Sequence, residues 1–177
     1  QIILEEYDIK NINKETLKDY RIRFKIHKGE THEWNKIDDE EFLYRLNALD
    51  RQTKKLTLAG LLMFGEEKDI VSILPNYFLD YREIKDSVTT ERWSNRITSW
   101  DDSWTGNLWD FFEKIVNRLT ADLEIPFELD NNLMRIEDTT IHKCIREALS
   151  NSLIHTQYDE SGSIVIEKGE NYFKFAN

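Results

Sequence analysis

The chain has 177 residues, of which 40% are hydrophobic, 33% are charged and 12% are aromatic. This balance is typical of a folded globular protein and excludes an intrinsically disordered or collagen-like chain. The formal net charge of −10 opposes binding to the phosphate backbone of nucleic acids. The longest apolar run, residues 61–64, is far too short to cross a bilayer, so a membrane-spanning protein is not expected.

Cysteine usage and the chain ends suggest a piece of a cytoplasmic protein. Cys144 is the only cysteine, so no disulfide can form within the chain, which fits a reducing cytoplasm. The simplest interpretation of this thiol is a small core residue. The chain begins Gln-Ile-Ile without Met and stops within a predicted strand, so we expect flanking sequence to contribute to function.

Charge is distributed unevenly along the first 50 residues. Residues 10–28 carry seven Lys or Arg against two acids, whereas residues 29–50 carry seven acids against two bases. The favoured interpretation is a solvated basic helix followed by the acidic start of another helix. Direct DNA binding through the basic helix is the alternative.

The first half of the chain predicts a short strand and three helices. The strand covers residues 2–4. Asn13 is a good N-cap for a helix over residues 14–27, which Gly29 would end. Asp38 or Asp39 starts an acidic helix over residues 39–49. Thr57 and Gly65 bound a short helix that is apolar all round and therefore buried.

The next segments predict strands and one long helix. Residues 69–75 and 76–84 are short and rich in β-branched or aromatic residues, so each is predicted to be a strand, with a third within 92–100. The longest amphipathic helix is expected over residues 107–122. Its inward positions are Leu108, Phe111, Phe112, Ile115 and Leu119. Residues 101–110 combine acids with Trp, and a core role is favoured over a stacking surface.

The last third predicts extended segments, a helix and a hairpin. Residues 124–129 and 133–137 are expected to be extended. Asp138 or Thr139 would cap the next helix, and residues 163–176 predict a β-hairpin that turns at Lys168-Gly169. The predicted fold is α+β, or mixed α/β, with helices packed on small sheets.

A polar pair marks the helix that begins near residue 139. At 100° per residue, its apolar positions form one stripe, with Glu147 and Asn151 stacked one turn apart at the edge. The stripe comprises Ile141, Cys144, Ile145, Ala148, Leu149 and Ser152. A carboxylate that orients water and an amide oxygen that binds Mg²⁺ would suit such a pocket rim. The spacing alone is common on helices and carries little specificity.

The wider sequence around this pair resembles a known family. The run "IREALSNSLIHTQYDESGSIVIEKGENYFKFAN", with "LTLAGLLMFG", "NYFLDYRE…ERW" and "GNLWDFF" before it, is similar to bacterial and archaeal transcriptional regulators related to RecG-type ATP-dependent DNA helicases. The resemblance covers nearly the whole chain. It implies a Schlafen-type AlbA-like domain before this chain, then a divergent ATPase module of the gyrase, Hsp90, histidine-kinase and MutL (GHKL) type.

The resemblance implies roles for four residues. Glu147 would be the catalytic general base or water-orienting residue, and Asn151 would bind the cofactor through Mg. His155 and Asn177 would also contact the nucleotide, Asn177 as the first residue of an expected "NPG" turn. For His155 a structural role at the helix end is the favoured alternative. Tyr158 matches the family pattern without a clear chemical role.

The resemblance also implies a domain division. Residues 1–124 would be a middle α+β region and residues 125–177 the start of the GHKL-like module, a helix plus β-hairpin of its α/β sandwich. The glycine-rich elements that would hold adenine and phosphates are absent. We therefore expect ATP and Mg to bind only in a longer protein, and this chain alone not to be catalytic.

Three functions remain open from the sequence. The first is a DNA-binding transcriptional regulator whose nucleotide module senses or gates, with DNA contacted by regions outside this chain. The second is an ATP-dependent, helicase-related enzyme, although the chain has no Walker A loop. The third is an interaction or dimerisation module with a vestigial pocket, for example a homodimer. No membrane partner is expected.

Overall fold

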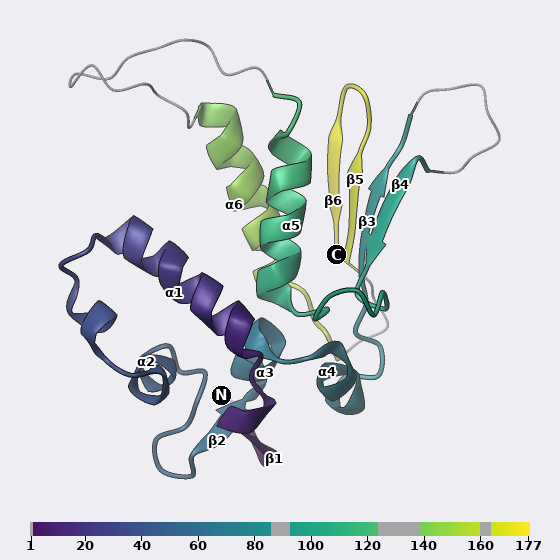
Figure 1. Cartoon of the computed structure of the whole chain (residues 1–177). Coiled ribbons are helices and arrows are strands. Elements are labelled where there is room, and N and C mark those ends of the chain that lie inside the picture. The colour runs from purple at the N-terminus through teal and green to yellow at the C-terminus, as the bar shows by residue number, and fades with distance from the viewer. Residues whose placement is uncertain (1, 86–92, 124–138, 160–163) are drawn as a thin grey trace. The chain divides into compact units, whose positions relative to one another are not determined.

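The computed structural model describes residues 2–85, 93–123, 139–159 and 164–177 (Figure 1). As predicted, the fold is α+β: the described helices accompany one two-stranded and one four-stranded sheet. The chain forms two compact units. Unit 1 comprises residues 1–77 and 99–111, and unit 2 comprises residues 78–98 and 112–177.

Unit 1 is mainly helical, with a small antiparallel sheet. Its elements are β1 (Ile3–Asp8), β2 (Lys55–Thr57), α1 (Lys14–Lys28), α2 (Asp39–Arg45), α3 (Leu58–Phe64), α4 (Glu67–Ile73) and the 3-10 turns η1 (Ile9–Asn11) and η2 (Glu33–Lys36). The predicted caps are confirmed, because the side chains of Asn13, Asp38 and Thr57 accept the first backbone N–H bonds of α1, α2 and α3. Helix α2 ends earlier than predicted.

One segment predicted to be a strand is a helix. Residues 69–75 were expected to be extended because of their β-branched side chains, but α4 covers most of them. Ile70 and Leu74, one helical turn apart, are both buried, so burial favours the helical period over local propensity. The backbone N–H of Glu67 donates to the carbonyl of Thr105, 2.7 Å away, which satisfies one N-terminal donor of α4.

An aromatic cluster fills the space beside α1. The Tyr20 ring lies 5.2 Å from the Phe64 ring and 4.7 Å from the Trp109 ring, both in edge-on geometry. The Phe24 ring stacks on Trp34 at 5.5 Å. Trp109, in the acidic Trp segment, also donates from its indole to Asp19 at 3.0 Å. The contacts of Trp109 are therefore those of a packing residue, as the sequence favoured.

A buried amide joins three helix ends in unit 1. Asn107 has no exposed surface; its Nδ2 donates to the carbonyl of Gly65 at 3.0 Å and to Thr16 Oγ1 at 3.3 Å. Its Oδ1 accepts from the backbone N–H of Asp110 at 2.9 Å, which caps α5 (Leu108–Thr120). The Thr16 hydroxyl in turn donates to Asp110 Oδ2 at 2.9 Å. The start of α1, the end of α3 and the start of α5 are thus held by one network.

Unit 2 is built on the four-stranded sheet. Its strands are β3 (Leu79–Glu83), β4 (Asn95–Thr98), β5 (Ile164–Lys168) and β6 (Phe173–Ala176), in the order β4-β3-β5-β6, and its helices are the rest of α5 and α6 (Thr140–Ile154). Strands β3 and β5 pair in parallel, and the other two pairs are antiparallel. The β5–β6 hairpin confirms the one predicted from residues 163–176.

One face of this sheet is apolar. The parallel register sets Leu79 beside Ile164 and Tyr81 beside Ile166, and all four side chains are buried. The core of unit 2 also includes Ile115, Leu119, Ile145, Leu149 and Leu153 from the two helices. Of the five inward positions predicted for α5, four are buried (Leu108, Phe111, Ile115 and Leu119) and Phe112 is half-buried.

The opposite sheet face carries a charged network around Asp80. This carboxylate is fully buried, and Arg96 donates to both of its oxygens at 2.8 Å. Arg82 donates to Oδ2 at 2.9 and 2.6 Å. Burial alone would raise the pKa of Asp80, but the hydrogen bonds and charges of Arg96 and Arg82 outweigh it and lower the pKa. Trp93 packs against both guanidinium groups.

The predicted domain boundary falls at a segment outside the description. Residues 124–129 and 133–137, expected to be extended, lie among the undescribed residues 124–138. The compact units do not divide the chain at residues 124 and 125, because β3, from the first half of the chain, pairs with β5. Within the described ranges, no helix combines the length and apolarity that crossing a membrane requires.

Replacing Asn107 with Ala is expected to destabilise unit 1. The variant loses the cap of α5 and leaves the Gly65 carbonyl without this donor, so we expect a loss of about 2–4 kcal/mol in the free energy of unfolding. Urea unfolding followed by Trp fluorescence measures it. Asn117→Ala, the same change at an exposed position of α5, should stay within about 0.5 kcal/mol of the original chain. Equal losses would contradict the role of Asn107.

Replacing Asp80 with Asn is expected to destabilise unit 2 in a pH-dependent way. The change leaves Arg82 and Arg96 without their carboxylate, so we expect the free energy of unfolding to fall by about 2–4 kcal/mol at pH 7. Solvent limits this fall, because both guanidinium groups are partly exposed.

The pH dependence follows from the lowered pKa of Asp80. The stability that the Asp80 carboxylate provides is fully present above its unfolded-state pKa of 3.8. It is lost as the pH falls through the lower pKa of the folded state. Urea midpoints of the two proteins should therefore converge in strong acid. Asp159→Asn, at an exposed aspartate, is the matched control. A pH-independent difference would contradict this assignment.

Candidate functional site

The helix that carries the predicted nucleotide residues is capped at both ends. Thr139 Oγ1 lies 2.7 Å from His142 Nδ1 and accepts from the His142 backbone N–H, so Thr139 is the N-cap of α6. At the other end the Tyr158 hydroxyl donates to the carbonyl of Leu153 at 2.6 Å. Burial raises the pKa of Tyr158. The described contacts therefore give Tyr158 a structural role, because its hydroxyl satisfies a carbonyl in the last turn of α6.

The buried face of α6 differs from the predicted apolar stripe. His142, Ile145, Leu149 and Leu153 are buried and repeat at helical spacing, as a face that packs on a core requires. Ile141 is 56% exposed, and Cys144 is exposed, which corrects the expectation that this thiol is a core residue. The stripe expected from the sequence is thus rotated around the helix, because His142 and Leu153, which that stripe omitted, take part in packing.

Glu147 and Asn151 lie together on the other side of α6. Each follows a buried residue by two positions, Ile145 and Leu149 respectively, which places it about 200° around the helix. Both side chains are exposed and stand one turn apart, as their spacing predicted. The pair is therefore on the surface of unit 2, and not at the edge of the buried face.

The other two predicted residues are exposed as well. His155 follows Asn151 by four positions, and its backbone N–H donates to the Asn151 carbonyl at 3.0 Å, so it forms the C-cap of α6. Asn177 follows β6, and α6 packs against β6. Glu147, Asn151 and His155 thus follow one line along the helix, whereas Asn177 lies on another element, after β6.

A separate cavity of about 680 Å³ opens in unit 2 where β3 and β5 end. Its walls include Glu83, Arg118, Asp122, Lys168, Tyr172 and Phe173. Ligands of open α/β sheets often bind beyond the carboxyl ends of parallel strands, which is the position of this cavity. The sequence alone does not indicate this cavity, because the parallel pairing that creates it joins residues more than eighty positions apart.

The charges around this cavity are already matched. Lys168 Nζ donates to the carbonyl of Arg118 at 2.7 Å and to Asp122 Oδ2 at 2.8 Å. The hydrogen bond and charge of Lys168 lower the pKa of Asp122. Arg118 lies 3.8 Å from Glu83. Because cations and acids neutralise one another, the cavity has no evident preference for a charged ligand.

Possible metal ligands are dispersed over the described ranges. These residues contain no group of three or more His, Cys, Asp or Glu side chains placed to hold a metal ion. Glu147 and Asn151 offer two oxygen-bearing side chains. Such a pair fits Mg²⁺ only where phosphate oxygens and waters supply the remaining ligands, which is the usual state of this ion.

Part of the chain matches a protein family, and the fold is similar to that of a solved structure. Residues 1–80 match the family described as "Domain of unknown function (DUF8451)", which is less than half of the chain. No functionally curated protein matches. The crystal structure of the DIP2311 protein from Corynebacterium diphtheriae is similar over 94% of this chain, with a TM-score of 0.63 and 15% sequence identity. The chain spans about 30% of that protein, and at this identity the likeness concerns the fold alone.

Proposed function

We propose that unit 2 is part of a nucleotide-binding module that senses or gates in a DNA-binding transcriptional regulator. The observation that supports this most is the placement of Glu147 and Asn151, one turn apart on the exposed face of α6. The fold holds this face away from the core. A polar pair there is available to a ligand without disturbing the packing of Ile145 and Leu149.

The chemistry of the pair suits a magnesium-bound triphosphate. The Asn151 amide oxygen is a hard ligand for Mg²⁺, which keeps most of its coordination as phosphate oxygens and waters. Glu147 would orient the water for slow hydrolysis. His155, next along the same line of the helix, would contact the nucleotide beside them. Asn177 is proposed to take part through a turn that follows it.

The DNA-reading part of the regulator is proposed to lie outside this chain. A net charge of −10 opposes a DNA phosphate backbone, whose contacts normally supply most of the affinity. The helicase-related enzyme is the weaker alternative, since motors of that kind use a Walker A loop that is absent here. A strand-separation assay on the full-length protein tests it.

The third candidate, an interaction module with a vestigial pocket, also has an observation in its favour. Glu147 and Asn151 are exposed and do not line the cavity at the ends of β3 and β5. An oxygen pair in open solvent binds a cation weakly, because water competes for it. Nucleotide binding therefore requires walls supplied from beyond Asn177.

Calorimetric titration with Mg-ATP separates these two proposals. The polypeptide extended beyond Asn177 should bind Mg-ATP, whereas the 177-residue chain should bind it weakly or not at all. In the extended polypeptide, Asn151→Ala should weaken binding at least about tenfold, which corresponds to 1.4 kcal/mol. Glu147→Gln should leave binding nearly intact and abolish slow phosphate release, because its proposed role concerns the attacking water.

Asn171→Ala is the matched control for this titration. Asn171 is an exposed amide in the turn between β5 and β6. It lines the cavity and does not belong to α6. Unchanged binding in this variant, with loss in Asn151→Ala, supports the α6 site. The reverse pattern would place the nucleotide in the cavity, and no binding by the extended polypeptide would favour the interaction module.

A further inference from the structure

A groove of about 600 Å³ runs along the exposed side of α1 in unit 1. Its lining combines aliphatic side chains, including Ile9 and Ile22, with four basic and two acidic ones: Lys14, Lys18, Arg21, Lys25, Glu15 and Asp39. Lys14, Lys18 and Ile22 follow one another at four-residue spacing and therefore share one face of the helix. The seven Lys and Arg of residues 10–28 thus include a row beside a groove, which the sequence could not distinguish from a solvated face.

The lysines of this groove are only loosely held by the protein itself. Lys18 lies 3.7 Å from Glu15 and Lys25 lies 3.2 Å from Glu30, and in both pairs the side chains are at least half exposed. Pairs of this kind contribute little to stability. Among the described residues, Lys14 forms no ion pair, and its side chain is exposed. Three ammonium groups along the groove are therefore available to an outside acid.

Arg21 has a different role. It donates to Asp39 and to the carbonyl of Ile37, both at 2.6 Å, and its side chain is only 21% exposed. These contacts join α1 to the start of α2. Arg21 forms part of the wall and is not counted among the groups that recognise a partner.

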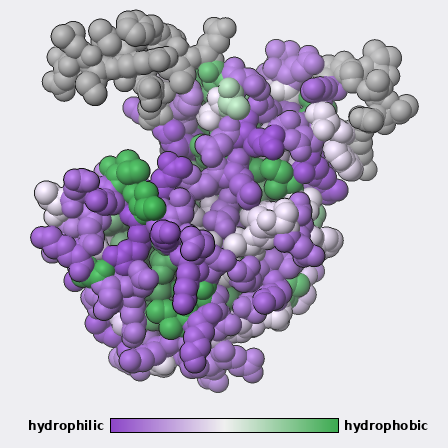
Figure 2. Space-filling view, in the orientation of Figure 1, coloured by the Kyte–Doolittle hydropathy of each residue, from purple (hydrophilic) through white to green (hydrophobic). Residues whose placement is uncertain are grey.

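Aliphatic side chains are exposed beside these lysines. Ile22 is 50% exposed, Ile26 is 72% exposed and Ile9 is 36% exposed. Ile22 and Ile26 stand one turn apart on α1. Figure 2 shows hydrophobic groups interrupting the otherwise hydrophilic surface of this unit. Branched aliphatic side chains on a helix surface gain from burial, so a ligand that covers them must itself be partly apolar.

We propose that this face of α1 docks an acidic, amphipathic helical segment of a partner protein. The partner's acids would pair with Lys14, Lys18 and Lys25, while its aliphatic side chains would cover Ile22 and Ile26. The occupant follows from charge complementarity, since residues 10–28 carry seven bases against two acids within a chain of net charge −10. Helix-in-groove recognition by spaced apolar anchors is an established mode of binding.

Two other occupants fit this surface less well. The phosphates of a nucleic acid would pair with the lysines, but they would leave the isoleucines exposed. The groove lining also contains no aromatic ring for base stacking. A second copy of the chain would have to offer its own acidic stretch, residues 29–50.

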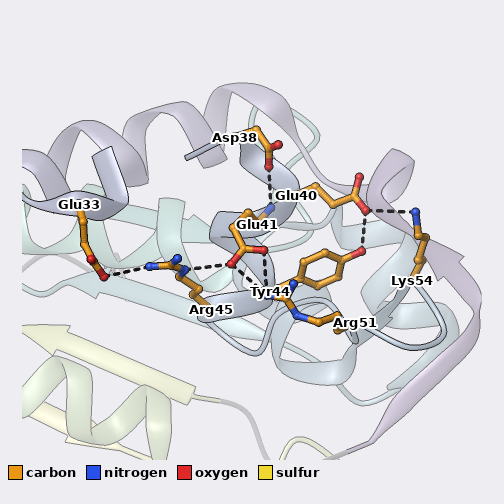
Figure 3. A network of polar contacts seen from close by, with 8 residues as sticks. All are labelled: Glu33, Asp38, Glu40, Glu41, Tyr44, Arg45, Arg51 and Lys54. Atoms are coloured by element: carbon orange, nitrogen blue, oxygen red, sulfur yellow. Dashed lines mark hydrogen bonds and ion pairs between the residues drawn. The ribbon is translucent and has the colours of Figure 1, made fainter. Parts of the chain in front are cut away.

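Four of those acids, Glu33, Asp38, Glu40 and Glu41, already have partners within unit 1, as Figure 3 shows. Glu41 accepts from Arg45 at 3.0 Å and from Arg51 at 2.8 Å, which lowers the pKa of Glu41. Glu40 accepts from the Tyr44 hydroxyl at 2.6 Å and raises the pKa of Tyr44 to about 12. Self-association through this stretch would break these contacts, so a separate partner is the better match.

Fluorescence anisotropy with a designed peptide tests the proposal. The probe is a labelled helical peptide of roughly 15 residues, the length of α1, with Leu at helical spacing and Glu at the other positions. We expect saturable binding that weakens with salt. Lys14→Glu/Lys18→Glu should weaken it at least about tenfold, and Ile22→Ser/Ile26→Ser should weaken it severalfold without changing its salt dependence.

A charge swap and a matched control make the test specific. The Lys14→Glu/Lys18→Glu variant should bind the corresponding Leu-Lys peptide that the original chain rejects. Lys36→Glu/Lys68→Glu makes the same charge change at exposed lysines of unit 1 outside the groove lining and should keep binding of the acidic peptide. Circular dichroism verifies that each variant is folded.

Three results would overturn the proposal. Equal weakening in the control would mean general electrostatic attraction, and equal binding of a scrambled peptide would mean that the amphipathic pattern is not read. Tighter binding of a duplex DNA of matched charge, lost in Lys14→Glu/Lys18→Glu, would identify a nucleic-acid surface instead.

Discussion

The arrangement of unit 1 depends on a buried amide whose nitrogen and oxygen both have hydrogen-bond partners. Asn107 donates both Nδ2 protons, to Thr16 and Gly65, and its oxygen accepts from Asp110. Helix ends expose backbone groups that must find partners, and burying them without partners is costly. Because one side chain serves the start of α1, the end of α3 and the first turn of α5, these helix ends are held together within unit 1. This fixed position of α1 sets which of its faces packs on the aromatic cluster and which faces solvent.

Unit 2 follows a different constraint, the parallel pairing of β3 with β5. That pairing brings residues 79–83 beside residues 164–168 and places four apolar side chains on one face, where α6 buries Ile145 and Leu149. The same pairing puts Asp80 on the other face with its two arginines. Once the core takes the face of α6 that includes His142, the pair Glu147 and Asn151 must point outward.

The sequence predicted local features well and long-range ones poorly, for physical reasons. Asn13, Thr57 and Gly29 act within their own turn of chain, so their residue types alone indicated the helix ends. Residues 69–75 are predicted to be a strand because their β-branched side chains favour one. Burial within unit 1 selects a helix instead. The buried Asp80 was not anticipated, since its arginine at position 96 arrives through strand pairing.

The candidate site shows the same limit. The spacing of Glu147 and Asn151 correctly placed them one turn apart, but their position relative to the core could not be obtained from an apolar pattern that includes the exposed Ile141 and Cys144. A helical wheel weighs every apolar residue equally, while packing selects only those that meet a neighbouring element. His142 is a polar residue that packing buries, and it shifts the inferred face.

The exposure of Glu147 also sets a condition on any chemistry at this site. Catalysis by a carboxylate relies on excluding bulk water and fixing one water in place, because electrostatic interactions are weak in a high dielectric. In the described part of unit 2 the Glu147 side chain faces solvent, so the proposed role of Glu147 in orienting a water requires walls from a longer polypeptide. Asn151 depends less on such a wall, since a triphosphate supplies most magnesium ligands itself. The proposed site would therefore bind a nucleotide more readily than it would hydrolyse one, which suits the proposed sensing role better than work on a nucleic acid.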